Sequence, residues 1–134
     1  MANVLLVEDE ALIVAVLSSA ITRQGHTCVT ASNGKEGLKR FSEDSFDLVI
    51  TDIVMPEKEG LEIIVTMRRT MPDVKIIAMS GGGRTGTAEY LHAAETLGAM
   101  ATLKKPIRLA DFVSVLDRCL KASSGARLPT MCST

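Results

Sequence analysis

The sequence is poor in aromatic residues. Phe, Tyr and Trp make up 3% of its 134 residues, and Trp is absent. Hydrophobic residues still account for 46% of the chain, so the core must be built from Val, Ile, Leu, Ala and Met. Aliphatic cores of this kind are typical of parallel strands that are buried beneath helices on both faces. At this length the chain is expected to fold as one compact domain.

Several other features are lacking, and each excludes a class of protein. No apolar run is long enough to cross a bilayer and no signal peptide is visible, so we expect a cytoplasmic protein with no membrane partner. The three cysteines, Cys28, Cys119 and Cys132, lack the spacing of a metal site and suit a reducing compartment. Fifteen basic and sixteen acidic residues give a net charge of −1 without a basic cluster, so direct nucleic-acid binding is not expected.

What is present is a regular alternation of apolar runs and helix-like segments. The runs lie at residues 4–7, 26–31, 46–52, 74–79 and 100–103, and a segment of helical character follows each. This alternation predicts an α/β fold: a single doubly wound, flavodoxin-like sheet of five parallel strands with helices on both faces, (βα)5. The second run alternates instead of being wholly apolar, which predicts a strand near the sheet edge. Residues 1–122 form the predicted domain, and the polar residues 123–134 are expected to be a disordered tail.

Polar side chains follow four of the five predicted strands. Glu8 and Asp9 come after the first, Asp52 ends the third, Ser80 follows the fourth and Lys105 follows the fifth. Because ligands of such sheets bind beyond the carboxyl ends of the strands, these side chains are expected to meet. Clustered carboxylates repel one another without a cation, and this ligand set suits Mg²⁺ that shares a phosphate oxygen. A carboxylate can accept a phosphoryl group as an acyl phosphate, with a lysine as point charge and a hydroxyl as hydrogen-bond partner. Any one of these residues alone is better explained as a cap, but the whole set is not.

Five motifs give the chain a resemblance to a known family. They are residues 7–10 (VEDE), 51–56 (TDIVMP), 59–61 (EGL), 79–81 (MSG) and 105–106 (KP). Over about residues 3–121 the sequence resembles the receiver domains of bacterial response regulators, the switches of two-component signal transduction. The resemblance implies a phosphorelay protein that accepts a phosphoryl group from the phosphohistidine of a sensor kinase or phosphotransfer protein. No output domain follows in this sequence, so we expect either a stand-alone receiver that acts on another, unidentified protein or a receiver that belongs to a longer chain. Phosphorylation-dependent dimerisation is one expected form of output.

The resemblance also assigns roles to the residues at the strand ends. The implied magnesium ligands are Glu8 (mainly through water), Asp9, Asp52 and the backbone carbonyl of Val54. Asp52 is in addition the implied phosphoacceptor, Ser80 the switching hydroxyl and Lys105 the contact to the phosphoryl group. The bond from Lys105 to Pro106 is expected to be cis.

The sequence departs from the family pattern at two positions. The residue three before Lys105 is commonly aromatic, with a ring that rotates on activation, and here it is Thr102. Glu59 stands where Asp is more usual before Gly60. Because Thr102 has no ring, the usual switch, in which a hydroxyl and an aromatic ring move together, is not expected in that form.

Two other function classes are open to a chain with these features. A phosphatase of the haloacid dehalogenase type would carry a second Asp two residues after the nucleophile, where this chain has Val54. A degenerate receiver would bind a partner without phosphorylation and would lack part of the acidic set or the lysine, which are all present. An enzyme acting on an external substrate is therefore not expected. The glycine-rich residues 81–87 lack a P-loop ending, and His26 and His92 come with no motif, so a nucleotide site and a histidine relay are not favoured.

Overall fold

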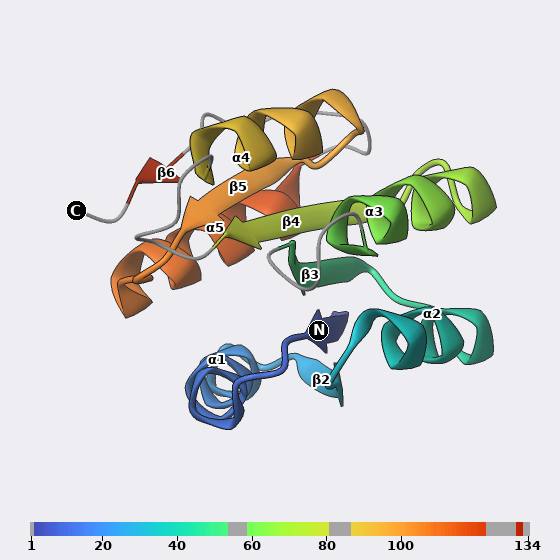
Figure 1. Cartoon of the computed structure of the whole chain (residues 1–134). Helices are drawn as coiled ribbons and strands as arrows, with labels where there is room; N and C mark the ends of the chain where they lie inside the picture. Colours follow the sequence, from blue (N-terminus) through green and yellow to red (C-terminus); the bar gives the residue numbers. More distant parts are fainter. Residues whose placement is uncertain (1, 54–58, 81–86, 123–130, 133–134) are drawn as a thin grey trace.

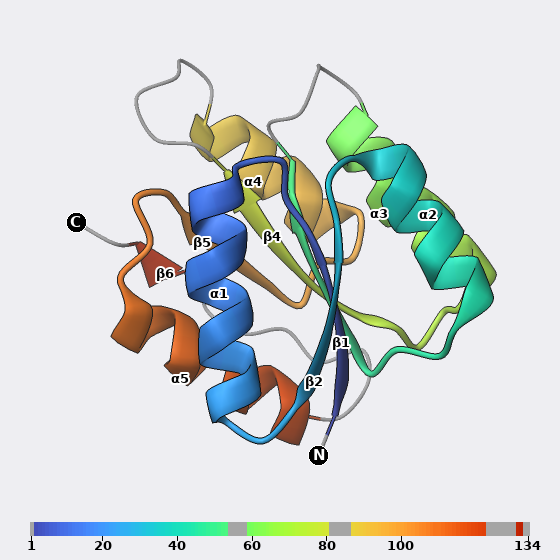
Figure 2. The same cartoon turned by 90° about the horizontal axis from the view of Figure 1, so that it is seen from below.

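A parallel β-sheet forms the centre of the molecule, and helices cover both of its faces (Figure 1, Figure 2). The computed structural model describes residues 2–53, 59–80, 87–122 and 131–132. The strands are β1 (Asn3–Val7), β2 (Thr27–Ala31), β3 (Leu48–Asp52), β4 (Lys75–Ser80), β5 (Ala101–Lys104) and β6 (Met131–Cys132). The helices are α1 (Ala11–Arg23), α2 (Gly34–Glu43), α3 (Glu59–Thr70), α4 (Thr87–Thr96) and α5 (Leu109–Lys121). The strand order is β2-β1-β3-β4-β5-β6, and every neighbouring pair is parallel.

Alternate residues of each central strand enter two separate hydrophobic cores, because successive side chains of a strand point to opposite faces. In β1, Leu5 and Val7 belong to the core beneath α2, α3 and α4, whereas Val4 and Leu6 belong to the core beneath α1 and α5. The same division runs through β3 and β4, while Ala101 and Leu103 of β5 belong to the core beneath α1 and α5. Both faces of these strands are therefore dry, which explains why the sequence shows unbroken aliphatic runs there.

The helix boundaries follow from capping and glycine signals that the sequence contains. The Asn33 side chain accepts a hydrogen bond from the backbone N–H of Glu36 (2.8 Å) at the start of α2, which satisfies one of the free donors of a first helical turn. Gly25 (φ 88°) follows α1 and Gly98 (φ 114°) follows α4, and both adopt the left-handed conformation that glycine allows.

The predicted α/β fold of five parallel strands is confirmed, and β2 lies at the sheet edge as its alternating pattern predicted. One correction is needed at the other edge. Met131 and Cys132 form β6 beside Leu103 and Lys104 of β5, although the sequence predicted disorder throughout residues 123–134. A strand of two residues carries no readable period, so its pairing depends on the free edge of β5 and not on a local pattern. The rest of that segment lies outside the described residues.

The order of the strands reverses between β1 and β3, since the chain turns outward to β2 and then crosses to the other side of β1. Crevices at such a reversal, beyond the carboxyl ends of the strands, are where ligands bind in sheets of this kind. Within the described residues, no helix has the length and apolar character needed to cross a membrane.

Candidate functional site

Three strands place their terminal residues at this reversal. β1 runs beside β3 with Val7 opposite Thr51, so Glu8 emerges next to Asp52. Lys105 follows β5 and is held by its own backbone N–H, which donates to the carbonyl of Ser80 at the end of β4 (2.7 Å). Strand pairing alone thus brings together side chains that are up to 97 positions apart in sequence.

The Lys105 ammonium donates hydrogen bonds to two carboxylates. Its Nζ lies 2.7 Å from Glu8 Oε1 and 3.0 Å from Asp52 Oδ2. All three residues are buried, with exposed fractions of 8% for Lys105, 1% for Glu8 and 3% for Asp52. A third carboxylate, Glu10, reaches 3.9 Å from the same ammonium but is exposed to solvent. Glu10 was not among the predicted site residues, because an exposed acid at a helix start carries no signal by itself.

Burial and pairing shift the acid–base equilibria of this cluster. Burial raises the pKa of Glu8 to about 7, although hydrogen bonds from Lys105 and from the Glu10 backbone oppose that rise. For Lys105, burial acts to lower the pKa, but the hydrogen bond to Glu8 and the charge of Asp52 outweigh it and raise the pKa above its ordinary value. Lys105 therefore stays cationic, while the two buried acids share one positive charge.

The donor set fits a divalent cation. Glu8, Asp9 and Asp52 each offer a carboxylate oxygen, and these atoms lie within 4.8 Å of one another. The charge balance supports the same conclusion, because two buried carboxylates face one ammonium and the exposed Asp9 adds a further negative charge. Oxygen ligands of this kind suit a hard cation such as Mg²⁺. The predicted fourth ligand, the carbonyl of Val54, lies outside the described residues.

Ser80, the remaining predicted site residue, ends β4 beside β3, where Asp52 is opposite Met79. Its side chain is fully buried, and its Oγ has no hydrogen-bond partner in the described part of the chain. The same is true of Thr102 Oγ1 on β5. The sequence marked Thr102 as a departure from a pattern, but it could not show that two unpartnered hydroxyls would be buried on neighbouring strands.

Close backbone packing fixes the loop side of the site. A Cβ atom on Gly60 would lie 2.5 Å from the Ile53 Cα, so α3 can begin against the end of β3 only with glycine there. The Lys105–Pro106 bond is cis, as expected. The approach of α3 to residue 53 could not be derived from sequence spacing, because it depends on how the helix docks.

A hollow of about 260 Å³ with apolar walls opens beside Lys105. It is lined by Leu12, Ile13, Val16, Leu17, Lys105, Pro106 and Ile107. A second hollow of about 430 Å³ shares Val16 and continues between α1 and α5 to Leu109 and Val113. Leu12, Val16 and Leu109 are 76%, 46% and 46% exposed, which is unusual for large apolar side chains. We call the surface formed by these three residues the α1–α5 apolar face; the sequence analysis missed it.

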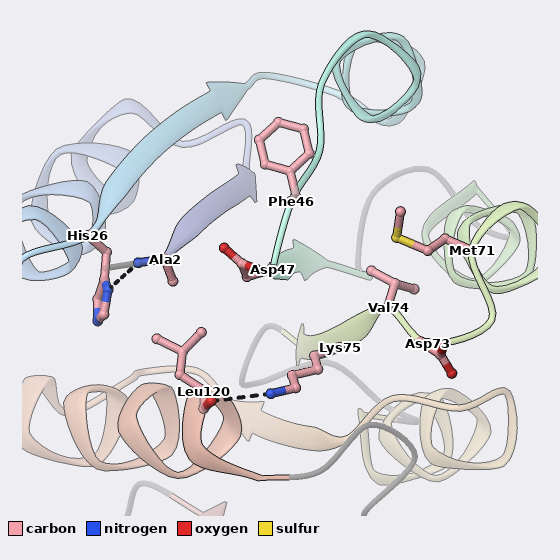
Figure 3. Close-up of a pocket in the computed structure, with 9 residues that line it drawn as sticks. All are labelled: Ala2, His26, Phe46, Asp47, Met71, Asp73, Val74, Lys75 and Leu120. Atoms are coloured by element: carbon pink, nitrogen blue, oxygen red, sulfur yellow. Dashed lines mark hydrogen bonds between the residues drawn. The ribbon is translucent and has the colours of Figure 1, made fainter.

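Another hollow, of about 470 Å³, lies at the opposite edge of the sheet, where the strands begin (Figure 3). There His26 Nδ1 accepts a hydrogen bond from the backbone N–H of Ala2 (3.0 Å), and Lys75 donates to the Leu120 carbonyl (3.2 Å). These bonds join segments that are distant in the sequence. They agree with the interpretation of His26 as an ordinary structural residue, remote from the acidic cluster.

Comparison with known proteins identifies the family. The model of the response regulator receiver domain matches residues 4–117, so the chain belongs to this family. It is 37% identical over 123 residues to the DNA-binding transcriptional regulator NtrC of Azospirillum brasilense, covering 92% of this chain but 25% of that protein. It is 30% identical to the response regulator receiver protein CpdR of Brucella abortus, covering 92% of this chain and 100% of that protein. A receiver domain structure from Clostridium thermocellum has a TM-score of 0.80 and 29% identity, covering 90% of this chain and 94% of that one.

The chain is thus a phosphoacceptor receiver of the two-component type, and the reading as a degenerate receiver is not favoured. Receiver domains are signalling domains that work between a phosphodonor and downstream partners. The chain spans about a quarter of the length of the transcriptional regulators that it matches, at 25% and 28% of two of them.

Proposed function

We propose that Asp52 accepts the phosphoryl group in a magnesium-dependent reaction, with Lys105 and Ser80 as its partners. The observation that carries this assignment is the bond from Lys105 Nζ to Asp52 Oδ2 (3.0 Å), at a buried site where Glu8 and Asp9 also converge. Asp52 and Glu8 are the buried carboxylates that this ammonium touches. Asp52 is proposed as the acceptor because it ends the central strand β3, where its carboxylate lies among Glu8, Asp9 and the Lys105 ammonium.

The proposed reaction is an in-line displacement. A carboxylate oxygen of Asp52 attacks the phosphorus of a phosphohistidine, the P–N bond breaks, and its electron pair returns to the imidazole nitrogen. The product is an acyl phosphate on Asp52. Lys105, which is already cationic and close to Asp52, then pairs with a phosphoryl oxygen, and Ser80 donates its hydroxyl hydrogen to another.

Bound Mg²⁺ would neutralise charge on the transferring phosphoryl oxygens. The residues that would hold it are Asp9 and Asp52 directly, Glu8 mainly through water, and the Val54 carbonyl. The protein's own contribution is to keep the acids close together. Lys105 offsets part of their repulsion, and the dry core beneath them fixes their backbone.

The phosphodonor is proposed to be a sensor histidine kinase or a phosphotransfer protein that docks on the α1–α5 apolar face. This face adjoins the site, because Lys105 and Pro106 line its hollow and Lys105 also touches Asp52. A partner that buried Leu12, Val16 and Leu109 would remove apolar surface from water and bring its histidine to the edge of the acidic cluster.

The output is proposed to involve α4, β5 and α5, where phosphorylation would alter binding of a downstream protein or of a second copy. Support comes from the connection of this region to the site: Ser80 and Lys105 are joined through the backbone bond that links β4 to β5. Nucleic-acid binding is not part of the proposal, because the chain has a net charge of −1 and no basic cluster.

Intact-mass spectrometry after treatment with acetyl phosphate tests the assignment. In Mg²⁺, the wild type should gain one phosphoryl group, and Asp52→Asn should gain none. Chelation of the metal should abolish the gain in the wild type. Equal labelling of wild type and Asp52→Asn, or full labelling in chelator, would contradict the roles given to Asp52 and to the metal.

A further inference from the structure

Two buried hydroxyl groups lack hydrogen-bond partners in the described part of the chain. They are Ser80 Oγ and Thr102 Oγ1, and both residues have exposed fractions of 0%. The backbone on either side of them is paired in the sheet: Met100 N–H donates to the Ile76 carbonyl and Lys105 N–H donates to the Ser80 carbonyl. Buried polar groups in native proteins nearly always have a partner, including ordered water. The pair therefore requires a physical explanation.

The register of β4 and β5 places these hydroxyls on one face of the sheet. Thr102 is opposite Ala78, and Ser80 is opposite Lys104. Ala78 belongs to the core beneath α4, whereas Ala101 and Leu103, which flank Thr102, belong to the other core. Since side chains alternate along a strand, Ser80 and Thr102 both face the α4 side and are diagonal neighbours.

The spacing of diagonal neighbours suits one water molecule. Diagonal positions lie roughly 7–8 Å apart in a sheet, and the register puts the Ser80 and Thr102 side chains at two such positions on one face. Neither hydroxyl bonds directly to the other within the described residues, and one water between diagonal neighbours would supply a partner to both. Ala78, the residue opposite Thr102, has a small side chain, and a buried water needs at least two polar partners, which the two hydroxyls supply.

We propose that Ser80 and Thr102 share one buried water and that Thr102 thereby positions the Ser80 hydroxyl for the phosphoryl group on Asp52. This inference rests on the proposed function of Asp52. Thr102 donates to the water, the water donates to Ser80 Oγ, and Ser80 donates to a phosphoryl oxygen. In this series of hydrogen bonds each hydroxyl or water oxygen donates one hydrogen toward the phosphoryl group. The negative charge of the phosphoryl group therefore strengthens every hydrogen bond in the series. Thr102 is a positioning residue in this arrangement and does not touch the phosphoryl group.

Two matched pairs of side chains isolate the Thr102 hydroxyl. Thr and Val have nearly the same shape, and Ser and Ala differ by one oxygen. The probe is beryllium fluoride in Mg²⁺, which binds a carboxylate as a mimic of the acyl phosphate, and its affinity is measured by amide NMR titration. Thr102→Val should weaken binding roughly three- to tenfold, the size expected for one hydrogen bond. Thr102→Ser should bind as wild type does, and Thr102→Ala should bind as weakly as Thr102→Val.

The dependence on Ser80 separates positioning from a structural role. In a Ser80→Ala background, Thr102→Val should cause no further loss of affinity for beryllium fluoride, because the hydrogen bonds from Thr102 no longer lead to the phosphoryl mimic. Equal affinities of wild type and Thr102→Val would overturn the proposal that Thr102 positions the Ser80 hydroxyl. The same loss of affinity with and without Ser80 would overturn it as well. If Thr102→Val does not fold, the Ser and Ala variants at this position give the same comparison. Asp52→Asn separates failure of the Thr102 proposal from failure of the proposed function. If this variant binds beryllium fluoride as wild type does, the assignment of Asp52 as the phosphoacceptor fails.

Discussion

Lys105 Nζ lies 3.0 Å from Asp52 Oδ2, so the residue after β5 neutralises the residue at the end of β3 across the intervening strand β4. The same ammonium lies 2.7 Å from Glu8 Oε1. One cation thus serves two buried carboxylates, and any added positive or negative charge must change how Lys105 is shared. Under the proposed function, both a bound metal ion and a phosphoryl group on Asp52 would redistribute these contacts of Lys105.

Replacing Lys105 by Met should strongly destabilise the metal-free protein at neutral pH. The change leaves Glu8 and Asp52 buried without their cation, and breaking a buried ion pair in this way costs about 3–5 kcal/mol. Chemical denaturation with and without Mg²⁺ measures the free energy of unfolding, and Mg²⁺ should restore part of the loss. Lys104→Met is the matched control, since Lys104 is half-buried on β5. Equal losses in the two variants would contradict the role of the buried pair.

Replacing Gly60 by Ala should displace the start of α3 from the Ile53 backbone and so disturb the position of Asp52. The added methyl group would lie 2.5 Å from the Ile53 Cα, and backbone cannot yield as a side chain can. Overpacking of this kind costs roughly 1–3 kcal/mol, and labelling by acetyl phosphate should slow because Ile53 adjoins Asp52. Gly37→Ala offers a comparison, because its methyl group would meet the side chain of Val7 at 2.8 Å and not backbone atoms. The prediction fails if Gly37→Ala is as slow to label as Gly60→Ala.

Replacing Leu12 by Ser should impair phosphotransfer from a protein donor without affecting acetyl phosphate. The exposed Leu12 side chain belongs to the α1–α5 apolar face and not to the acidic cluster. The rate of transfer should be measured from a purified phosphohistidine protein that labels the wild type, with a loss of roughly tenfold for about 1.4 kcal/mol of lost apolar contact. Met71→Ser is the control, since Met71 is exposed at the distant hollow. Slower labelling of Leu12→Ser by acetyl phosphate as well would place the defect in the site and not in docking.

The thiol of Cys119 should report on the packing of α5 through its pH dependence. Burial raises the pKa of this thiol from its ordinary value of 9.0 to about 12. The folded protein therefore holds the proton more tightly, and its stability should fall as the pH rises from about 9 toward 12. In a Cys28→Ser, Cys132→Ser variant, iodoacetamide should modify Cys119 very slowly at pH 8 and rapidly in urea. Rapid modification of the folded protein would show that α5 does not bury this residue.

Much of the fold could be predicted because local and global signals agree. The aliphatic runs exist since β1, β3 and β4 are dry on both faces, and the alternating pattern of β2 reflects its edge position. β6 could not be predicted, because Met131 and Cys132 pair with β5 only through the backbone of a distant edge.

The acidic cluster was also accessible from the sequence, because parallel strands must end at one edge of the sheet. The contacts within it were not. The groups that Lys105 contacts depend on side-chain geometry, which the sequence does not give. The structure shows that its ammonium bonds to both Glu8 and Asp52. Ser80 and Thr102 have hydroxyls without partners among the described residues, and both are buried by tertiary packing, which no local pattern encodes.

Chemical trapping of the phosphorylated residue tests the central claim most directly. Borohydride reduces an acyl phosphate on aspartate to homoserine, and tandem mass spectrometry then reads the position of the altered residue. After treatment with acetyl phosphate and Mg²⁺, homoserine should appear at position 52 and at no other carboxylate. Homoserine at position 9, or an unmodified Asp52 in protein that has gained a phosphoryl group, would contradict the assignment of Asp52 as the phosphoacceptor.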